Sequence, residues 1–467
     1  MRSEPQAGDY RPDTPILTLA PWLADAVAAA DFPRHELRFR NHRWGPSVGL
    51  ESLSDAEWVD HFGRFQPLEG NLPQPLALRY HGHQFRNYNP QIGDGRGFLF
   101  AQMRDSSGRL LDLGTKGSGQ TPYSRDGDGR LTLKGAVREI MATEMLEALG
   151  VYTSKTFSVI ETGEELWRGD EPSPTRSAVL LRLSHGHIRI GTFQRLRAFE
   201  QAEHMAFLVD YCLDQFPGPP PPDDAPGRDE PAVMLLHQVV ERMADLSASY
   251  MVAGFVHGVL NSDNMNVSGE SFDYGPWRWL PQWDPRFTAA YFDHSGLYAF
   301  GRQPEAILWN CGQLAIALRM LAETEPLVFA LERFGGLYQQ AMARRFCWRL
   351  GVEPQGLEAE MALITASERY MVENAMSPDT LFHRHRGGRD VPTGEFGDRL
   401  RQYRSAGDDA HPLWWEEAPP TLVIDEVERI WAAIAEQDDW TPLAEKVTAI
   451  RRLGDALGEA PIPAGHK

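Results

Sequence analysis

The sequence predicts an α+β fold in which a smaller β-rich part precedes a larger helical part. Two observations lead to this prediction. Short apolar runs bounded by glycine-containing turns occur before residue 198, and long amphipathic periods dominate after it. With 467 residues, the chain can form two or three domains or one large enzyme with a wide cleft. Its hydrophobic fraction of 42% and charged fraction of 24% are typical of a globular protein.

Four short runs in the first part predict strands. Residues 98–103 (FLFAQM) and 110–116 (LLDLGTK) flank a Ser-Ser-Gly turn, a pattern typical of a β-hairpin. Residues 156–162 (TFSVIET) and 177–183 (SAVLLRL) are rich in β-branched and other apolar side chains. Together these runs predict a sheet between about residues 80 and 195.

Helical spacing begins at Leu133, and Gly150 follows the last apolar residue of that period, which predicts one amphipathic helix inserted in the sheet. Further helices are expected near 199–215, 232–253, 304–321, 326–349, 356–375, 421–436 and 442–453. We therefore divide the chain into four segments: an N-terminal extension (1–79), a β-rich part (80–198), a helical part (199–385) and a C-terminal helical extension (386–467).

The formal charge of −19 excludes some classes of partner. Such a surface repels phosphate backbones and anionic lipid headgroups, so neither a nucleic acid nor a membrane is expected as a partner. The polar N-terminus does not resemble a secretory signal, no run approaches the roughly 18 apolar residues of a membrane span, and only three cysteines occur. A cytoplasmic protein is expected, in which a local cluster of Lys and Arg must hold any polyanionic ligand.

A glycine-rich turn is the first candidate for such a ligand site. In Gly93-Asp94-Gly95-Arg96-Gly97, backbone N–H groups can approach phosphate oxygens, although a purely structural turn also explains the glycines. Lys116 then ends a predicted strand, and Glu139 follows on the predicted helix. Separately, these two would be a solvated lysine and a helix-surface glutamate. Their order after the glycine turn is the order in which protein kinases assemble a phosphate-binding lysine and its orienting carboxylate.

A second kinase-like pattern lies in the helical part. His257 and Asn264 have the spacing of H-R-D-x-x-x-x-N, and Asp273-Tyr274-Gly275 replaces D-F-G. Val259 occupies the position of the catalytic aspartate and cannot accept a proton. Asp263 is the nearest replacement, and its alternative role is that of a turn residue. These patterns predict a protein-kinase-like bilobal fold, with a small β-rich N-lobe and a larger helical C-lobe.

Three His-x-His pairs do not support a zinc site. They are His81/His83, His185/His187 and His383/His385, and neither a cysteine nor a third histidine is placed to complete a tetrahedral site. Structural or surface roles are expected for all of them.

The sequence resembles the selenoprotein O family of pseudokinases, which transfer AMP from ATP to protein hydroxyls. The resemblance rests on YHGHQF (80–85), QIGDGRG (91–97), KGSGQTPYSRDGDGR (116–130), VREI (137–140), GFVHGVLNSDNM (254–265), DYGPW (273–277) and FGRQPEAILWN (300–310). It extends from about residue 40 to about residue 320.

The resemblance implies a role for each matching residue. Lys116, Arg182 and Arg189 would hold the terminal phosphate of an inverted ATP, with Glu139 paired to the lysine. Gly93, Gly95, Arg96, Asp128 and Gly129 would complete the nucleotide pocket. Asn264 and Asp273 would be the metal ligands, and Asp263 would be the general base. In this orientation the α-phosphorus faces the acceptor and pyrophosphate leaves.

The sequence therefore predicts a protein adenylyltransferase that uses ATP and Mg²⁺ or Mn²⁺ to modify Ser, Thr or Tyr hydroxyls of protein substrates. Two alternatives remain: a kinase-type phosphotransferase, and a catalytically inactive nucleotide-binding scaffold. We also expect Asp273 to face solvent, so that Asp273→Ala would abolish activity with little loss of stability.

Overall fold

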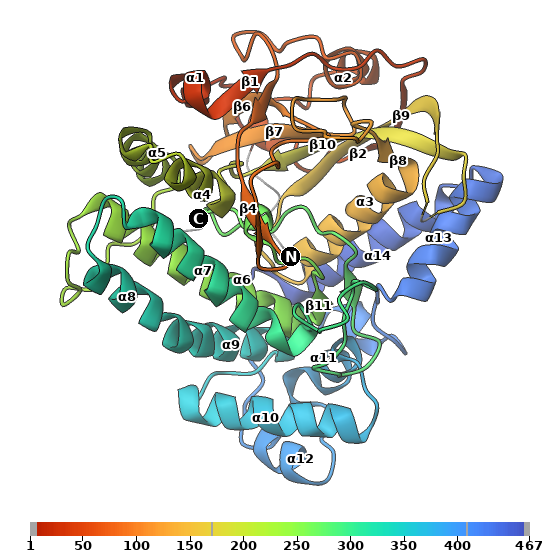
Figure 1. Ribbon diagram of the computed structural model, residues 1–467. Coiled ribbons are helices and arrows are strands. Elements are labelled where there is room, and N and C mark those ends of the chain that lie inside the picture. Colours follow the sequence, from red (N-terminus) through yellow and green to blue (C-terminus); the bar gives the residue numbers. More distant parts are fainter. Residues whose placement is uncertain (1–6, 170, 408–409, 462–467) are drawn as a thin grey trace.

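The main sheet of the protein has eight strands and is antiparallel throughout. The computed structural model describes residues 7–169, 171–407 and 410–461. The strand order is β1-β3-β6-β7-β10-β9-β2, with β8 paired to β10 (Figure 1). The bounds are β1 (Ala24–Ala26), β2 (Glu36–Arg40), β3 (Leu76–Leu78), β6 (Leu99–Arg104), β7 (Leu110–Lys116), β8 (Leu131–Thr132), β9 (Lys155–Leu166) and β10 (Thr175–Ser184). A sheet of this kind with separate helices confirms the α+β class.

The four strands expected from the sequence correspond to β6, β7, β9 and β10. The sheet also contains three strands from before residue 80, namely β1, β2 and β3. The same N-terminal stretch forms α1 (Ala20–Leu23) and α2 (Asp55–Phe62), and α2 begins with a capping box between Ser54 and Glu57. The predicted N-terminal extension thus contributes three strands to the sheet. The sequence did not predict these strands because they are short and weakly patterned.

Helix α3 (Leu133–Ala148) is present where the sequence predicts a helix, and it packs against β9 and β10. The Thr132 hydroxyl caps it by accepting a hydrogen bond from the Gly135 N–H. On its other side lies α14 (Thr441–Leu457), whose Arg451 is 2.6 Å from Glu144 of α3. Figure 1 shows α14 (blue) alongside α3 (orange). Helix α3 therefore lies between the sheet and α14.

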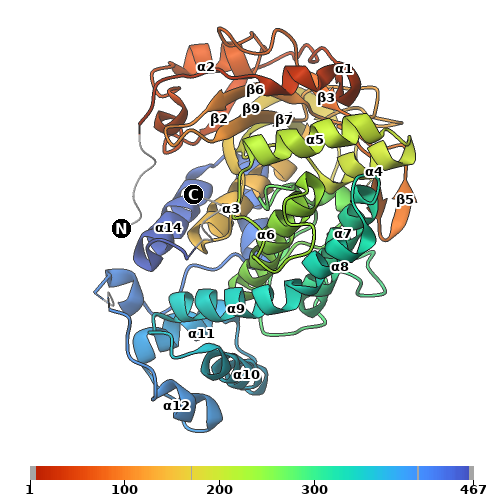
Figure 2. The ribbon, with the colours of Figure 1, turned by 90° about the vertical axis from the view of Figure 1, so that its left-hand side faces the viewer.

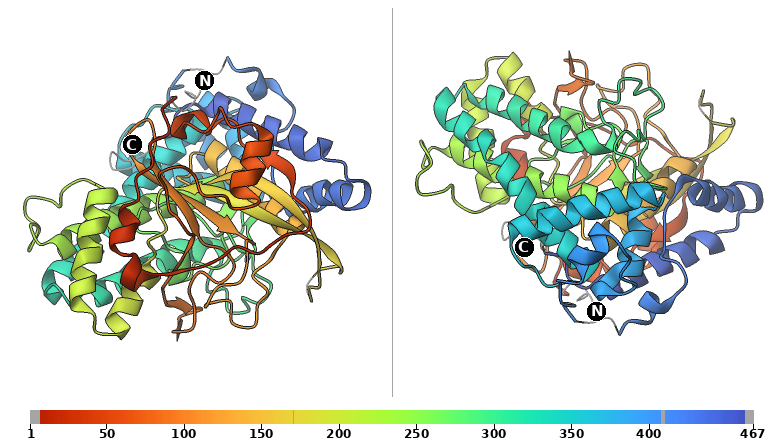
Figure 3. Two further views of the ribbon diagram at one scale, coloured as in Figure 1. Left: turned by 90° about the horizontal axis from the view of Figure 1, so that it is seen from above. Right: turned by 90° about the horizontal axis from the view of Figure 1, so that it is seen from below.

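The helices after residue 189 include the long, almost fully buried helix α6, which packs against α5, α7, α8, α9 and α11. Figure 2 shows α6 beside α7 and α8, with α9, α10 and α12 beneath, and Figure 3 shows the later helices from below. Their bounds are α4 (Ile190–Ala198), α5 (Ala202–Gln215), α6 (Pro231–Ala253), α7 (Gln303–Leu318), α8 (Thr324–Glu332), α9 (Phe334–Leu350), α10 (Leu357–Glu373), α11 (Pro378–His385), α12 (Glu395–Leu400) and α13 (Ile424–Gln437).

The helices differ from the sequence prediction in several places. The single helix expected over 326–349 is divided into α8 and α9 at Arg333, next to Gly335-Gly336, a pair that weakens a continuous helix. Helices α4, α11 and α12 were not predicted, because they have only nine, eight and six residues and so show little helical periodicity.

Two pairs of short strands lie outside the main sheet, next to loops near the centre of the molecule. The hairpin of β4 (Gly82–Gln84) and β5 (Asn87–Asn89) lies apart from the main sheet. The two-stranded pair of β11 (Phe255–Val256) and β12 (Arg278–Trp279) brackets the loop that carries Asn264 and Asp273.

Candidate functional site

A cavity of about 1150 Å³ lies between the sheet and the 259–277 loop. Its walls come from the glycine-rich turn, the end of β7, the start of α3 and the loop that contains Asp263 and Asp273. Every site residue proposed from the sequence lines this cavity. The volume is larger than the roughly 300–1,000 Å³ typical of ligand pockets, so the cavity can accommodate a nucleotide together with part of an acceptor.

The predicted pair of Lys116 and Glu139 is formed. The Lys116 ammonium, at the end of β7, contacts the Glu139 carboxylate of α3, and each residue is only 7% exposed. Burial lowers the pKa of Lys116, and nearby carboxylates oppose that shift. Lys116 Nζ also lies 3.4 Å from Asp273 Oδ1, so the strand, the helix and the loop meet at this ammonium.

Asp273 is the point where the cations of the site converge. Arg182 Nη1 lies 2.8 Å from its Oδ1, and Arg189 Nη1 lies 3.0 Å from its Oδ2. Burial alone would raise the pKa of Asp273, but Arg182, Lys116 and Arg189 outweigh burial and hold this pKa well below its usual range. The Asp273 side chain is 19% exposed, so the expectation that it faces solvent was wrong.

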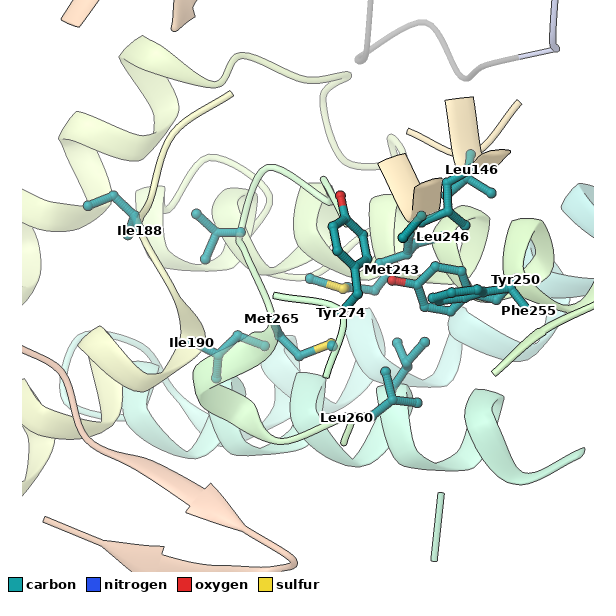
Figure 4. Close-up of a cluster of buried hydrophobic side chains, with 14 of the residues drawn as sticks. Leu146, Ile188, Ile190, Met243, Leu246, Tyr250, Phe255, Leu260, Met265 and Tyr274 are labelled. Atoms are coloured by element: carbon teal, nitrogen blue, oxygen red, sulfur yellow. The ribbon is translucent and has the colours of Figure 1, made fainter. Parts of the chain in front are cut away.

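The backbone at Asp273 is strained and firmly anchored. Its φ of 51° lies in the left-handed region, which non-glycine residues rarely adopt. The next residue, Tyr274, is buried in the hydrophobic cluster that also contains Leu146, Met243 and Leu246 (Figure 4). The Tyr274 hydroxyl lies 2.5 Å from Thr153 Oγ1, a bond that the phenylalanine of D-F-G could not make. This anchor keeps the Asp273 carboxylate directed at the cations.

Arg189 has partners that the sequence analysis did not identify. Its Nη2 lies 3.2 Å from Asp94 Oδ1, and its Nη1 donates to the backbone oxygen of Asp263 at 2.7 Å. The guanidinium stacks over the rings of Tyr80 and Phe272, at 4.4 and 4.7 Å from their centroids. Asp94 and Tyr80 belong to the motifs QIGDGRG and YHGHQF, so their positions within quoted motifs were the available signal.

Asp263 lies in the short 3-10 turn η3 (Ser262–Asn264) and is 8% exposed. Burial raises its pKa to about 6. Gln84 Nε2 lies 3.4 Å from its Oδ2, whereas its buried Oδ1 has no hydrogen-bond partner among the described residues. Asp263 lines the cavity, and a carboxylate whose pKa is raised toward neutrality is suited to accept a proton from a bound group.

The β4–β5 hairpin holds the Asp263 turn in place. The backbone N–H of His83 donates to Ser262 Oγ at 2.7 Å, and that of Phe85 donates to Asn261 Oδ1 at 3.0 Å. The YHGHQF motif therefore supports the loop with main-chain donors.

The contacts of Asn264 and His257 indicate different roles for these two residues. Asn264 Nδ2 donates to the backbone oxygen of Val259 at 2.9 Å, which leaves the amide oxygen available to a ligand. His257 is fully buried, and burial lowers its pKa to about 4, so this ring is neutral at pH 7 and packs in the core.

The remaining predicted residues form one wall of the cavity. A Cβ at Gly93 would lie 2.5 Å from the Tyr123 ring. Packing against this tyrosine is therefore sufficient to require a glycine at position 93, whether or not a phosphate binds there. Gly129 has φ +70° and lies against the backbone of Gly119. The last three predicted residues also line the cavity. Gly95 lies beside Tyr123, Arg96 lies at the cavity surface, and Asp128 is paired with Arg168 at 2.8 Å.

The donor atoms of this cavity fit a hard divalent cation. Among the described residues there is no group of three or more His, Cys, Asp or Glu side chains that could hold a metal. Asn264 and Asp273 instead offer an amide oxygen and a carboxylate on one wall. Mg²⁺ is commonly held by one or two such protein ligands together with phosphate oxygens and waters.

The site has the parts of a phosphate-transferring enzyme of the protein-kinase type: a Lys–Glu pair from strand and helix, a glycine-rich turn, and an Asn and an Asp from one loop. A family model described as "Protein adenylyltransferase SelO" matches residues 9–386. The chain belongs to this family of adenylyltransferases. The match extends beyond the 40–320 range that the motifs indicated.

Relatives named "Protein nucleotidyltransferase YdiU" match most of the chain. The protein from Synechococcus elongatus is 41% identical over 94% of this chain and 94% of its own length. The one from Synechocystis sp. is 42% identical over 91% of this chain and 95% of its own length. The one from Pseudomonas entomophila is 38% identical over 68% of this chain and 63% of its own length. The cyanobacterial relatives thus extend the similarity into the C-terminal third.

No helix in the described ranges is long and apolar enough to cross a membrane.

Proposed function

We propose that this adenylyltransferase moves AMP from ATP to Ser, Thr or Tyr hydroxyls of protein substrates and releases pyrophosphate. The observation that carries the proposal is the distribution of charge in the cavity. Lys116, Arg182 and Arg189 converge at one place, and the Asp263 carboxyl, whose pKa burial raises to about 6, lines the same cavity. The cations suit a polyphosphate, and the carboxylate suits an acceptor hydroxyl.

The phosphate end depends on charged hydrogen bonds in a buried setting. Arg182 and Arg189 are 5% and 4% exposed, so little water competes for their N–H groups. Inverted binding places the terminal phosphate here and directs the α-phosphorus toward the acceptor. Charge that develops on the leaving pyrophosphate is then stabilised by guanidinium and ammonium groups already in position.

Asp263 acts at the acceptor end. It takes the proton from the hydroxyl, whose oxygen forms a bond to the α-phosphorus as the bond between that phosphorus and the bridging oxygen breaks. The electron pair of the broken bond leaves with pyrophosphate. A carboxyl whose pKa is about 6 is ionised at pH 7 and more basic than an ordinary aspartate.

Asn264 and Asp273 are the residues that would hold Mg²⁺ or Mn²⁺. When bound, the cation offsets the negative charge of the nucleotide phosphates.

We further propose that the molecule has a protein-kinase-like bilobal arrangement. The sheet with α3 corresponds to the N-lobe, and the helices around α6 correspond to the C-lobe, with the boundary near residue 198. The lining of the cavity supports this division, because its residues come from β7 and α3 on one side and from the 259–277 loop on the other.

Labelled ATP tests the proposal. The purified full chain is incubated with Mg²⁺ and ATP labelled at the α- or the γ-phosphorus, and label in protein is measured after acid precipitation. Label from the α position alone is expected. Label from the γ position alone would refute AMP transfer and indicate a phosphotransferase. Tight ATP binding with neither label would indicate an inactive scaffold.

A further inference from the structure

His187 lies in the cavity and is held in a fixed orientation. It follows β10 and is 6% exposed. Its Nδ1 lies 3.0 Å from Asp112 Oδ2, and the other oxygen of Asp112 accepts a hydrogen bond from Gln102 Nε2 at 2.7 Å. Because Asp112 is fixed from both sides, it sets the plane of the imidazole ring and leaves Nε2 on the opposite edge.

The Nε2 edge lies against β7 at Gly114. A Cβ at this position would be 2.5 Å from His187 Nε2 and 3.7 Å from Arg182 Cγ. Arg182 is also the strand partner of Gly114. The absence of a side chain at Gly114 therefore makes room for both the imidazole and the arginine over one point of the sheet.

The same face of β7 carries the phosphate-binding lysine. Asp112, Gly114 and Lys116 alternate along the strand, so their side-chain positions share one face. The ring that Asp112 holds lies over Gly114, one step along this face from Lys116. Within the described chain, no hydrogen bond is made by His187 Nε2, and the residue borders the cavity, so this nitrogen is available to a bound ligand.

We propose that His187 Nε2 donates a hydrogen bond to the terminal phosphate of the nucleotide, with Asp112 as the residue that positions the ring. The ring would then bridge two anionic groups, Asp112 at Nδ1 and a phosphate oxygen at Nε2. This contact rests on the inverted orientation proposed above. A purely structural histidine, present only to satisfy Asp112, is the competing explanation.

The two explanations differ in how the ligands respond to a conservative change. An asparagine can place its amide nitrogen near the Nδ1 position and keep the bond to Asp112, but it has nothing at Nε2. We expect His187→Asn to weaken ATP and pyrophosphate binding on the order of 10- to 100-fold, the effect of one charged hydrogen bond, and to leave AMP binding within about twofold. AMP lacks the terminal phosphate, so it would not reach this contact.

Calorimetric titration of the full chain with ATP, pyrophosphate and AMP, each in the presence of Mg²⁺, measures these affinities. His187→Gln, which can place a donor near Nε2, is expected to recover most of the loss. His185→Asn is the matched control, because the His185 ring contacts Tyr152 and Phe216 and does not line the cavity. Its affinities for all three ligands should equal those of the wild type.

Three outcomes would overturn the inference: ATP affinity unchanged in His187→Asn, an equal loss for all three ligands, or no binding of ATP and pyrophosphate by the wild type. Failure of AMP transfer is scored separately by the label experiment. A selective loss of ATP and pyrophosphate affinity in an enzyme without AMP transfer would leave the His187 contact standing while refuting the proposed function.

Discussion

Removal of the Asp273 carboxylate should destabilise the metal-free protein strongly. In Asp273→Ala, Lys116 keeps its partner Glu139 and Arg189 keeps Asp94. Arg182 has no other carboxylate partner among the described residues and remains as a buried, uncompensated cation. Since an orphaned buried charge of this kind costs about 3–5 kcal/mol, we expect the free energy of unfolding to fall by about that amount.

Urea unfolding in EDTA, followed by fluorescence, measures this change. Two comparisons isolate its cause. Asp273→Ala combined with Arg182→Met removes the orphaned cation and should recover most of the lost stability. Asp128→Ala removes a half-exposed carboxylate from the wall of the same cavity and should change stability by no more than about 1 kcal/mol.

The charge argument also predicts a ligand effect. In EDTA, pyrophosphate should raise the unfolding midpoint of Asp273→Ala more than that of the wild type, because the anion replaces the missing counter-charge. The reasoning is refuted if Asp273→Ala unfolds at the wild-type urea concentration, or if Arg182→Met adds a second full loss to it.

Three further predictions concern other residues. Asp263→Asn should reduce the rate of label transfer by about 10²- to 10⁴-fold while ATP affinity, measured by calorimetry, stays within a few-fold; an equal rate would exclude a base at this position. Burial raises the pKa of Glu270 from 4.5 to about 7. The contribution of this residue to the free energy of unfolding therefore falls as the pH rises from about 4.5 to about 7, and stays low above that. Glu270→Gln should therefore stabilise the protein by about 3 kcal/mol at pH 8 and by nothing near pH 4, and denaturant curves that show no pH-dependent gain would contradict this. Tyr274→Phe removes the buried bond to Thr153 and should lower the free energy of unfolding by about 1–3 kcal/mol, whereas a neutral change would show that the hydroxyl is not needed there.

The strands and helices that were predicted correctly have strong local signals. β7 was expected at 110–116 and is Leu110–Lys116, because its run is bounded by a turn on one side and a glycine on the other. β1 and β3 have only three residues each and were missed. Strands this short depend on their neighbours in the sheet, so local patterning carries little information about them.

The candidate site was found by the order of its motifs along the chain. Lys116, Glu139, Asn264 and Asp273 follow one another at spacings that a known chemistry requires, and all four line one cavity. The exposure of Asp273 was the error, since no spacing reports how many cations surround a carboxylate.

The sequence by itself therefore determined the fold class, the main strands and helices, the family and the set of residues that meet in the cavity, because these follow from local periodicity and motif order. Only the tertiary structure decided that Asp273 is shared by Lys116, Arg182 and Arg189, that Asp94 and Tyr80 support Arg189, and that His187 lies over Gly114. Burial and charge at each position depend on groups that are distant in the chain and adjacent in space, and the local pattern of residues does not encode those distances.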